Sequence, residues 1–153
     1  MAATRIDINS FLELSAAHPV LDVRSPGENK HAHFPGAHSL PLFSDEERKV
    51  VGTTYKQQSR EDAIKTGLDY FGPKMRRMVE EVEALLTEHA AKKNQAANDR
   101  TILVYCWRGG MRSGAVSWLL DLYGFRVYTL IGGYKKYRQH VLQTFNEPYP
   151  FRI

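Results

Sequence analysis

The stretch TILVYCWRGGMRSG, from Thr101 to Gly114, decides the fold. Its first five residues are an apolar run rich in branched side chains, which predicts a buried strand over 101–105. Apolar residues at helical spacing predict a helix over about 113–123, and Gly124 follows where a left-handed cap belongs. Cys106 stands at the junction between the strand and the helix. Open parallel sheets bind ligands at the carboxyl ends of their strands, so we expect a site at this cysteine.

The loop after the predicted strand has the composition of an anion-binding loop. Adjacent glycines let backbone N–H groups turn inward as a nest, and the positive end of the following helix lies behind them. A helix N-terminus with arginines nearby favours the thiolate form of a cysteine. We therefore predict that Cys106 is an exposed nucleophile and that seven loop residues hold an anion, with the arginines contacting it directly: Trp107, Arg108, Gly109, Gly110, Met111, Arg112 and Ser113. The alternative for a lone cysteine at a strand end is a small, inert, buried side chain.

The rest of the chain alternates between apolar runs and helix-period stretches, which indicates an α/β fold. Further short strands are predicted over 20–23, 37–40 and 126–130. Further helices are predicted over about 10–17 and 73–89, and from 134 to a point before Pro148. Residues 43–70 are predicted to form a helical excursion or a long loop across one end of the sheet, and 92–100 a solvated connector. A length of 153 residues suits one domain over residues 1–153.

Composition narrows the class of protein. Apolar residues make up 42% and charged residues 25%, as in globular rather than disordered chains. The chain has no apolar run of 18 residues and no signal-like opening, so we expect neither a membrane partner nor secretion. A single cysteine excludes an internal disulfide and suits the cytoplasm. The net charge of +4 permits an anionic partner without demonstrating one.

Three motifs together resemble the rhodanese homology domain: DVRSPGE at 22–28, HFPGA at 33–37 and the Cys106 loop. The resemblance implies a three-layer α/β fold with a central, mostly parallel sheet flanked by helices. It also implies that Cys106 carries transferable sulfur as a persulfide. Asp22 and Arg24 would then end a strand on the same rim as the cysteine. Their carboxylate–guanidinium pair either shapes the pocket, as the resemblance implies, or simply anchors the loop.

Three finer features narrow the resemblance to the N-terminal domain of the tRNA 2-selenouridine synthases. They are EER at 46–48 with VGTTYK at 51–56, the loop CWRGGMRS, and GGYK at 132–135. Those enzymes replace the sulfur of a wobble 2-thiouridine with selenium from selenophosphate, and they normally continue into a P-loop domain. No G-x-x-x-x-G-K-[ST] motif occurs here; the nearest stretch, 67–74, has Pro73 where a backbone donor is needed. The expected partners are therefore a chalcogen donor, selenophosphate or a sulfur donor, and tRNA, with a P-loop domain supplied in cis or in trans. No cofactor is expected.

Two other functions stay open. Arg112 follows Cys106 in a Cys-x5-Arg-Ser spacing, one residue wider than in many rhodaneses, and this spacing is also that of cysteine phosphatases. A loop of this width admits a tetrahedral oxyanion, which a phosphate ester and selenophosphate both are. Tyr105 stands where those phosphatases usually have histidine, which argues against that function. The third possibility is a rhodanese module without activity that serves for docking.

Two basic clusters are candidates for RNA contact, with an ordinary solvated surface as the alternative. The first crowds the start of the predicted helix at 73–89, where the helix dipole disfavours cations: Lys74, Arg76 and Arg77. The second is interleaved with tyrosines: Lys135, Lys136 and Arg138. Trp107 either stacks on a base or forms a wall of the pocket. Three histidines lack a further ligand group at tight spacing, so no metal site is predicted: His31, His33 and His38.

Overall fold

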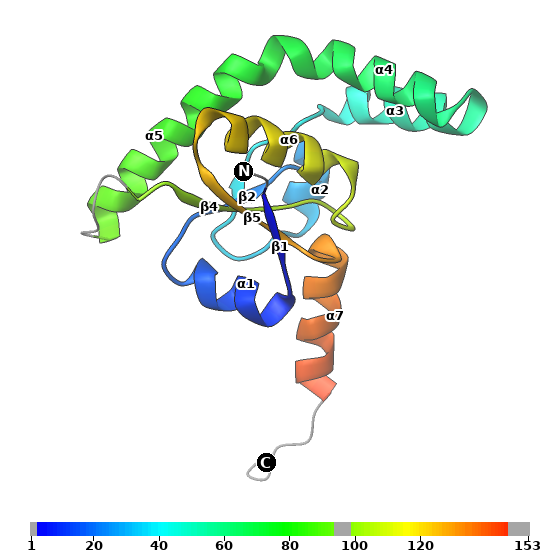
Figure 1. Ribbon diagram of the computed structural model, residues 1–153. Coiled ribbons are helices and arrows are strands. Elements are labelled where there is room, and N and C mark those ends of the chain that lie inside the picture. Colours follow the sequence, from blue (N-terminus) through cyan, green and yellow to red (C-terminus); the bar gives the residue numbers. More distant parts are fainter. Residues whose placement is uncertain (1–2, 94–98, 147–153) are drawn as a thin grey trace.

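The computed structural model describes residues 3–93 and 99–146 of the chain. In this described part, five parallel strands form one sheet in the order β1-β5-β4-β2-β3 (Figure 1). The strands are β1 (Thr4–Ile6), β2 (Val20–Asp22), β3 (His38–Ser39), β4 (Thr101–Tyr105) and β5 (Arg126–Leu130). Every residue of the central strand β4 is buried. Because all strands run the same way, their carboxyl ends meet at one edge, where Asp22 pairs in register with Tyr105.

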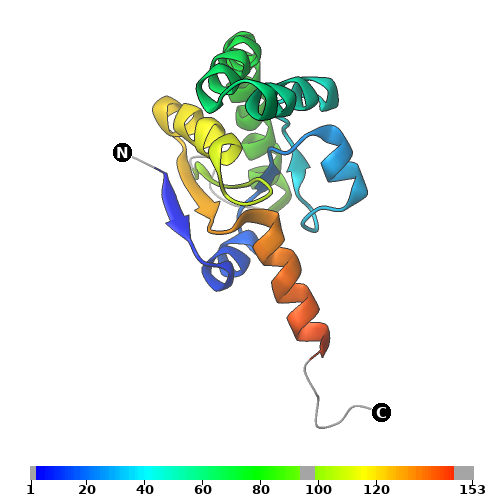
Figure 2. The same cartoon turned by 90° about the vertical axis from the view of Figure 1, so that its right-hand side faces the viewer.

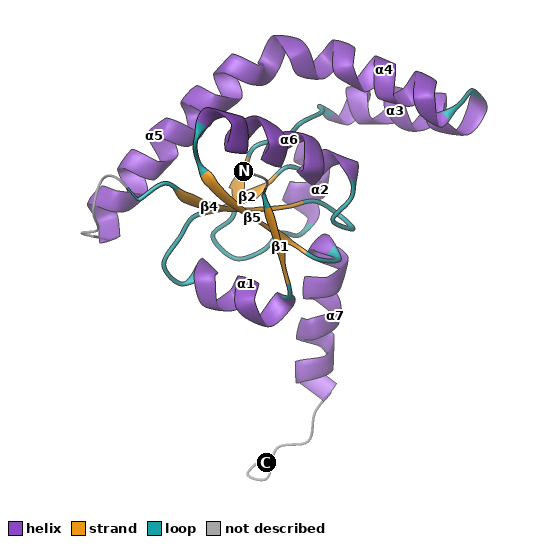
Figure 3. Ribbon diagram, in the orientation of Figure 1, coloured by secondary structure: helices purple, strands orange, loops and turns teal. Residues whose placement is uncertain are grey.

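Helices cover both faces of the sheet, which confirms the expected three-layer α/β architecture (Figures 1 and 2). One face carries α1 (Ile8–Ser15) and α7 (Gly133–Asn146), and the other carries α5 (Met75–Lys93) and α6 (Met111–Tyr123). Two helices, α3 (Asp45–Gln57) and α4 (Arg60–Phe71), form an antiparallel hairpin beside α6 and join α5 through the 3₁₀ turn η1 (Gly72–Lys74) (Figure 3). The short helix α2 (Pro26–His31) lies between β2 and β3 in the chain.

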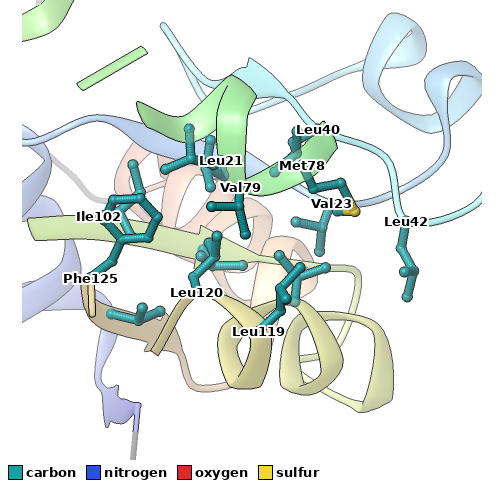
Figure 4. Close-up of a cluster of buried hydrophobic side chains, with 14 of the residues drawn as sticks. Leu21, Val23, Leu40, Leu42, Met78, Val79, Ile102, Leu119, Leu120 and Phe125 are labelled. Carbon is teal, nitrogen blue, oxygen red and sulfur yellow. The ribbon is translucent and has the colours of Figure 1, made fainter. Parts of the chain in front are cut away.

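The alternation of side chains along β4 divides the core in two. Ile102 and Val104 point to the face covered by α5 and α6, where they join the larger cluster that includes Leu21 and Met78 (Figure 4). Leu103 and Tyr105 point to the opposite face, into a cluster with residues of α1 and α7. Both faces of the sheet are therefore packed against helices.

The predicted strands at 101–105 and 126–130 are confirmed in full, and those at 20–23 and 37–40 are shorter than predicted. Gly124 caps α6 in the left-handed conformation with φ 113°, as expected. The predicted excursion at 43–70 is the α3–α4 hairpin, whose two helices are capped by the side chains of Ser44 and Ser59. In the described residues, no helix is long and apolar enough to cross a membrane.

Several predicted boundaries were wrong for local reasons. The first helix starts at Ile8, because Asp7 caps it by accepting a hydrogen bond from the Ser10 amide. Pro73 lies in the 3₁₀ turn before α5, and α5 runs on to Lys93, into the predicted connector. The middle of that connector, 94–98, lies outside the described residues. Strand β1 and helix α2 were not predicted, since three and six residues are too few to establish a period.

Candidate active site

Cys106 lies at the base of the loop that joins β4 to α6. Its Sγ donates a 3.2 Å hydrogen bond to Ser113 Oγ, and the Ser113 hydroxyl contacts Gly110 O at 3.2 Å. The residue is only 3% exposed, so the prediction of an exposed thiol was wrong. The first turn of α6 folds back over the strand end, and the sulfur packs against the larger core cluster. A reagent must therefore reach Cys106 through the loop.

The backbone of the loop rests on the start of α7. Cys106 O accepts a 2.8 Å hydrogen bond from Tyr134 N, and Trp107 O accepts one of 2.9 Å from Lys135 N. These two carbonyl oxygens are thus turned toward α7. No side chain caps α6 at Gly110, so its first N–H groups have no partner from a capping side chain. Uncapped N–H donors at the start of a helix are a common feature of anion sites. Anion binding at this loop stays a prediction.

Two glycines make this close backbone packing possible. Gly109 has φ 70°, and a Cβ there would come within 2.9 Å of Leu130 O. Gly133 has φ 59°, and a Cβ there would come within 2.4 Å of Cys106 O. The cysteine loop and the start of α7 at Gly133 therefore meet backbone to backbone. The GGYK stretch at 132–135 therefore packs directly against the backbone of the cysteine loop.

Arg112, predicted to hold the anion, is engaged by an acidic side chain. Its Nη1 and Nη2 lie 2.6 and 3.4 Å from Glu28 Oε1 and Oε2. Arg48 Nε lies 3.2 Å from the same Glu28 Oε1. Burial raises the pKa of Glu28, but it is outweighed by the hydrogen bond and charge of Arg112 together with the Ser25 amide and the charge of Arg48, so the pKa lies below its usual value. The guanidinium of Arg112 is therefore held in place by a carboxylate.

Glu28 was not predicted as a site residue, although it stands in the DVRSPGE motif. Its second task, in the capping box of α2 with Ser25, was visible in the Ser-x-x-Glu spacing. Its pairing with Arg112 joins residues 84 positions apart, which no local pattern reveals. Arg48 belongs to the EER stretch at 46–48, but nothing in that stretch points to the cysteine loop.

The other loop side chains differ in exposure. Trp107 is partly buried and stacks on Tyr134, with 6.1 Å between ring centroids and 29° between planes. This placement favours the interpretation of Trp107 as a wall. Arg108 and Met111 are exposed. Met111 also borders an apolar pocket of about 340 Å³ between the α3–α4 hairpin and the start of α6.

Asp22 and Arg24 form the predicted pair, and it is deeply buried. Arg24 Nη2 lies 2.8 Å from Asp22 Oδ2, and the two residues are 3% and 0% exposed. Tyr105 donates to Asp22 Oδ2 at 3.0 Å and accepts from Phe34 N at 3.0 Å. Burial, followed by the charge of Asp22, raises the pKa of Tyr105 far above its usual value. These contacts favour loop anchoring, because they fasten the segment from Arg24 to Phe34 to the sheet edge.

The first basic cluster is partly occupied by the protein's own acceptors. Lys74 lies in η1 rather than in the first turn of α5. Its Nζ donates to Leu42 O at 3.0 Å and forms an ion pair with Glu47. Arg76 Nε lies 3.5 Å from Glu80 Oε2. Of the three residues, Arg77 alone forms no ion pair with the part of the chain that the structure describes.

The second basic cluster adjoins the cysteine loop. Its members lie in the first turns of α7 and are exposed: Lys135, Lys136 and Arg138. Lys135 also touches the loop through its backbone amide.

Two of the three histidines that were considered as metal ligands contact protein atoms instead. His38 Nε2 lies 2.7 Å from Glu81 Oε2, and His33 Nδ1 lies 2.8 Å from Asn29 O. Among the described residues, no three candidate ligands gather into a metal site.

Comparison with known proteins assigns this arrangement to a family. The model of the rhodanese-like domain matches residues 7–140. The chain belongs to the rhodanese-like family. A tRNA 2-selenouridine synthase of Nitrosomonas europaea is 40% identical to this rhodanese-like domain over 128 residues, which are 82% of the chain and 30% of that protein. One of Bordetella petrii is 38% identical over 146 residues, 94% of the chain and 36% of that protein.

A solved structure shows the same relationship. It is the N-terminal domain of a Clostridium difficile 630 protein that is named for ATP/GTP binding. It is 39% identical, with a TM-score of 0.75, and the match covers 91% of this chain and 99% of that one. The rhodanese-like domain thus spans about a third of the length of the curated relatives it matches.

Proposed function

We propose that this rhodanese-like domain is a sulfur or selenium transferase that acts in the conversion of tRNA wobble 2-thiouridine to 2-selenouridine. The observation that carries the proposal is the placement of Cys106. It is the sole cysteine of the chain, and it lies at the carboxyl end of the central strand, beside the uncapped start of α6. Relatives named tRNA 2-selenouridine synthase match over most of the chain and support the choice of substrate.

The sulfur step can be written for thiosulfate as a donor. The Cys106 thiolate attacks the outer sulfur, a Cys–S–S bond forms, and sulfite leaves with the electron pair of the broken sulfur–sulfur bond. The α6 amides and Arg112 would hold the anionic donor and then the persulfide. The hydroxyl of Ser113, already 3.2 Å from Sγ, would hydrogen-bond the thiolate before attack.

We expect incubation with thiosulfate to add one sulfur atom to the peptide that contains Cys106, and cyanide to remove it as thiocyanate. Mass spectrometry of the digested protein checks the first step and a colorimetric thiocyanate assay the second. The Cys106→Ser variant is the control and should take up no sulfur. Hydrolysis of a phosphate ester without sulfur uptake would instead support the phosphatase, and inactivity in both assays the docking module.

The proposed partners are tRNA, a chalcogen donor and a P-loop domain supplied in cis or in trans. Relatives about three times as long as the region they share with this chain support the further domain. The second basic cluster is the surface we assign to RNA, because it is exposed beside the cysteine loop. A reducing compartment, the cytoplasm, suits a single reactive thiol.

This domain alone should bind tRNA weakly. Three exposed cations at the second basic cluster predict a log–log salt slope of about −2 to −3, at 0.7 to 0.9 per phosphate contact. Filter binding at two salt concentrations measures it. Replacing Lys135, Lys136 and Arg138 by glutamine should flatten the slope, whereas Lys92→Gln, on α5 with Glu88 as its partner, should not. Tight, salt-resistant binding by the parent domain would contradict the prediction.

A further inference from the structure

The α3–α4 hairpin is attached to the active-site arginine through a shared carboxylate. Arg48, in the first turn of α3, places Nε 3.2 Å from Glu28 Oε1, and the same oxygen is 2.6 Å from Arg112 Nη1. Asp45, also at the start of α3, accepts a 2.9 Å hydrogen bond from Gly27 N. Two neighbouring contacts therefore fix the start of α3 against the start of α2, with Glu28 between the two arginines.

The charges of this ion triad, Arg48–Glu28–Arg112, decide what the loop presents to a ligand. Arg112 and Glu28 alone form a neutral pair, which attracts an anion weakly. Arg48 adds a second positive charge beside the same carboxylate oxygen, so the triad carries a net charge of +1. The Glu28 and Arg112 side chains are only 16% and 20% exposed, so their charges are screened less than those of a surface pair. The side chain of Arg48 is 53% exposed and lines the apolar pocket beside Arg112.

We propose that Arg48 is a specificity-determining residue that tunes this site for doubly charged oxyanions. The proposal rests on the proposed function, since it assumes that an anion binds at the Cys106 loop. Arg48 acts through Glu28: it offsets the carboxylate charge so that Arg112 keeps its attraction for a ligand. Electrostatic energy scales with the charge of the ligand. Loss of Arg48 should therefore change the logarithm of the binding constant twice as much for a dianion as for a monoanion. A residue that merely held α3 in place would affect both anions equally.

Sulfate and perchlorate are suitable probes, because both are tetrahedral and they differ by one charge. The measurement is protection of Cys106, the sole cysteine, from iodoacetamide at constant ionic strength. In Arg48→Gln the protection constant should weaken about tenfold for sulfate and about threefold for perchlorate. Arg48→Lys restores the charge and should return sulfate protection to within about threefold of the parent. Arg126→Gln also removes one positive charge, but at the amino end of β5. It should change neither the sulfate nor the perchlorate protection constant.

The outcomes separate the two proposals. Failure of sulfate to protect Cys106 in the parent protein would contradict anion binding at the loop, and with it the proposed function. Protection by sulfate in the parent and equally in Arg48→Gln would overturn the role of Arg48 alone. Equal weakening of sulfate and perchlorate, without rescue by Arg48→Lys, would also overturn it, because a purely structural role would then suffice.

Discussion

We expect Gly133→Ala to displace the backbone of the cysteine loop. The added Cβ would lie 2.4 Å from Cys106 O, 2.6 Å from Gly109 N and 2.7 Å from Trp107 C. All three are backbone atoms, which cannot rotate away as a flexible side chain can, so the loop itself must move. Displacement of a reacting group by about 1 Å costs about 100-fold in rate, and sulfur uptake by Cys106 should fall by at least that much. The free energy of unfolding should drop by about 3 kcal/mol or more, from the clash and the strain at φ 59° together.

Gly36→Ala is the matched control for this variant. Gly36 also has a positive φ, 78°, but a Cβ there would meet nothing within 4 Å. It should therefore cost only the strain of a left-handed residue, about 1 to 2 kcal/mol, and leave sulfur uptake near the parent rate. Denaturant unfolding and persulfide formation, measured on both variants, give the comparison. Similar losses of activity in the two would show that contact with the loop is unimportant.

Arg112→Ala should abolish most of the anion affinity of the site. The substitution removes a cation. It also removes the bidentate partner of the Glu28 carboxylate, whose side chain is 16% exposed. The net charge of the triad falls from +1 to zero, because Arg48 and Glu28 remain as a neutral pair, so an approaching anion loses the attraction it had. Truncating one partner of such a pair typically costs 2 to 5 kcal/mol, so protection of Cys106 by sulfate should weaken about 100-fold.

Arg108→Ala provides the contrast within the same loop. Arg108 is exposed and is held by no described ion pair, so its charge is screened by solvent. We expect less than about a threefold change in sulfate protection from its removal. The measurement is again iodoacetamide labelling at a series of sulfate concentrations. Equal losses in the two variants would mean that the Glu28 contact does not single out Arg112.

The sequence predicted most accurately the elements whose hydrophobic pattern extends over several residues. Local periodicity and turn chemistry predicted the strand at 101–105, the helix that follows it and the cap at Gly124. The structure confirms all three. The depth of Cys106 could not be predicted in this way. It depends on how the first turn of α6 packs over the strand end, which is a tertiary property. The adjacent glycines and arginines suggested an open loop, whereas packing left Cys106 only 3% exposed.

Partnerships of charged residues were also beyond local reasoning. Arg112 could be assigned to the loop from its spacing to Cys106, but its carboxylate lies 84 residues earlier. Lys74 looked like an unfavourable cation at a helix start. In the structure it lies in a 3₁₀ turn and is held by Glu47, 27 residues earlier. The mere presence of a basic cluster in the sequence did not distinguish free cations from paired ones.

The hydrogen bonds from Tyr134 and Lys135 to the loop carbonyls have a consequence for assembly on the ribosome. A nascent chain exposes its only thiol well before these two amides leave the exit tunnel. Glu28 has been synthesised by then, but the loop lacks its second support until α7 has docked against β5. The two loop carbonyls therefore gain their hydrogen bonds only after α7 has been synthesised and has docked.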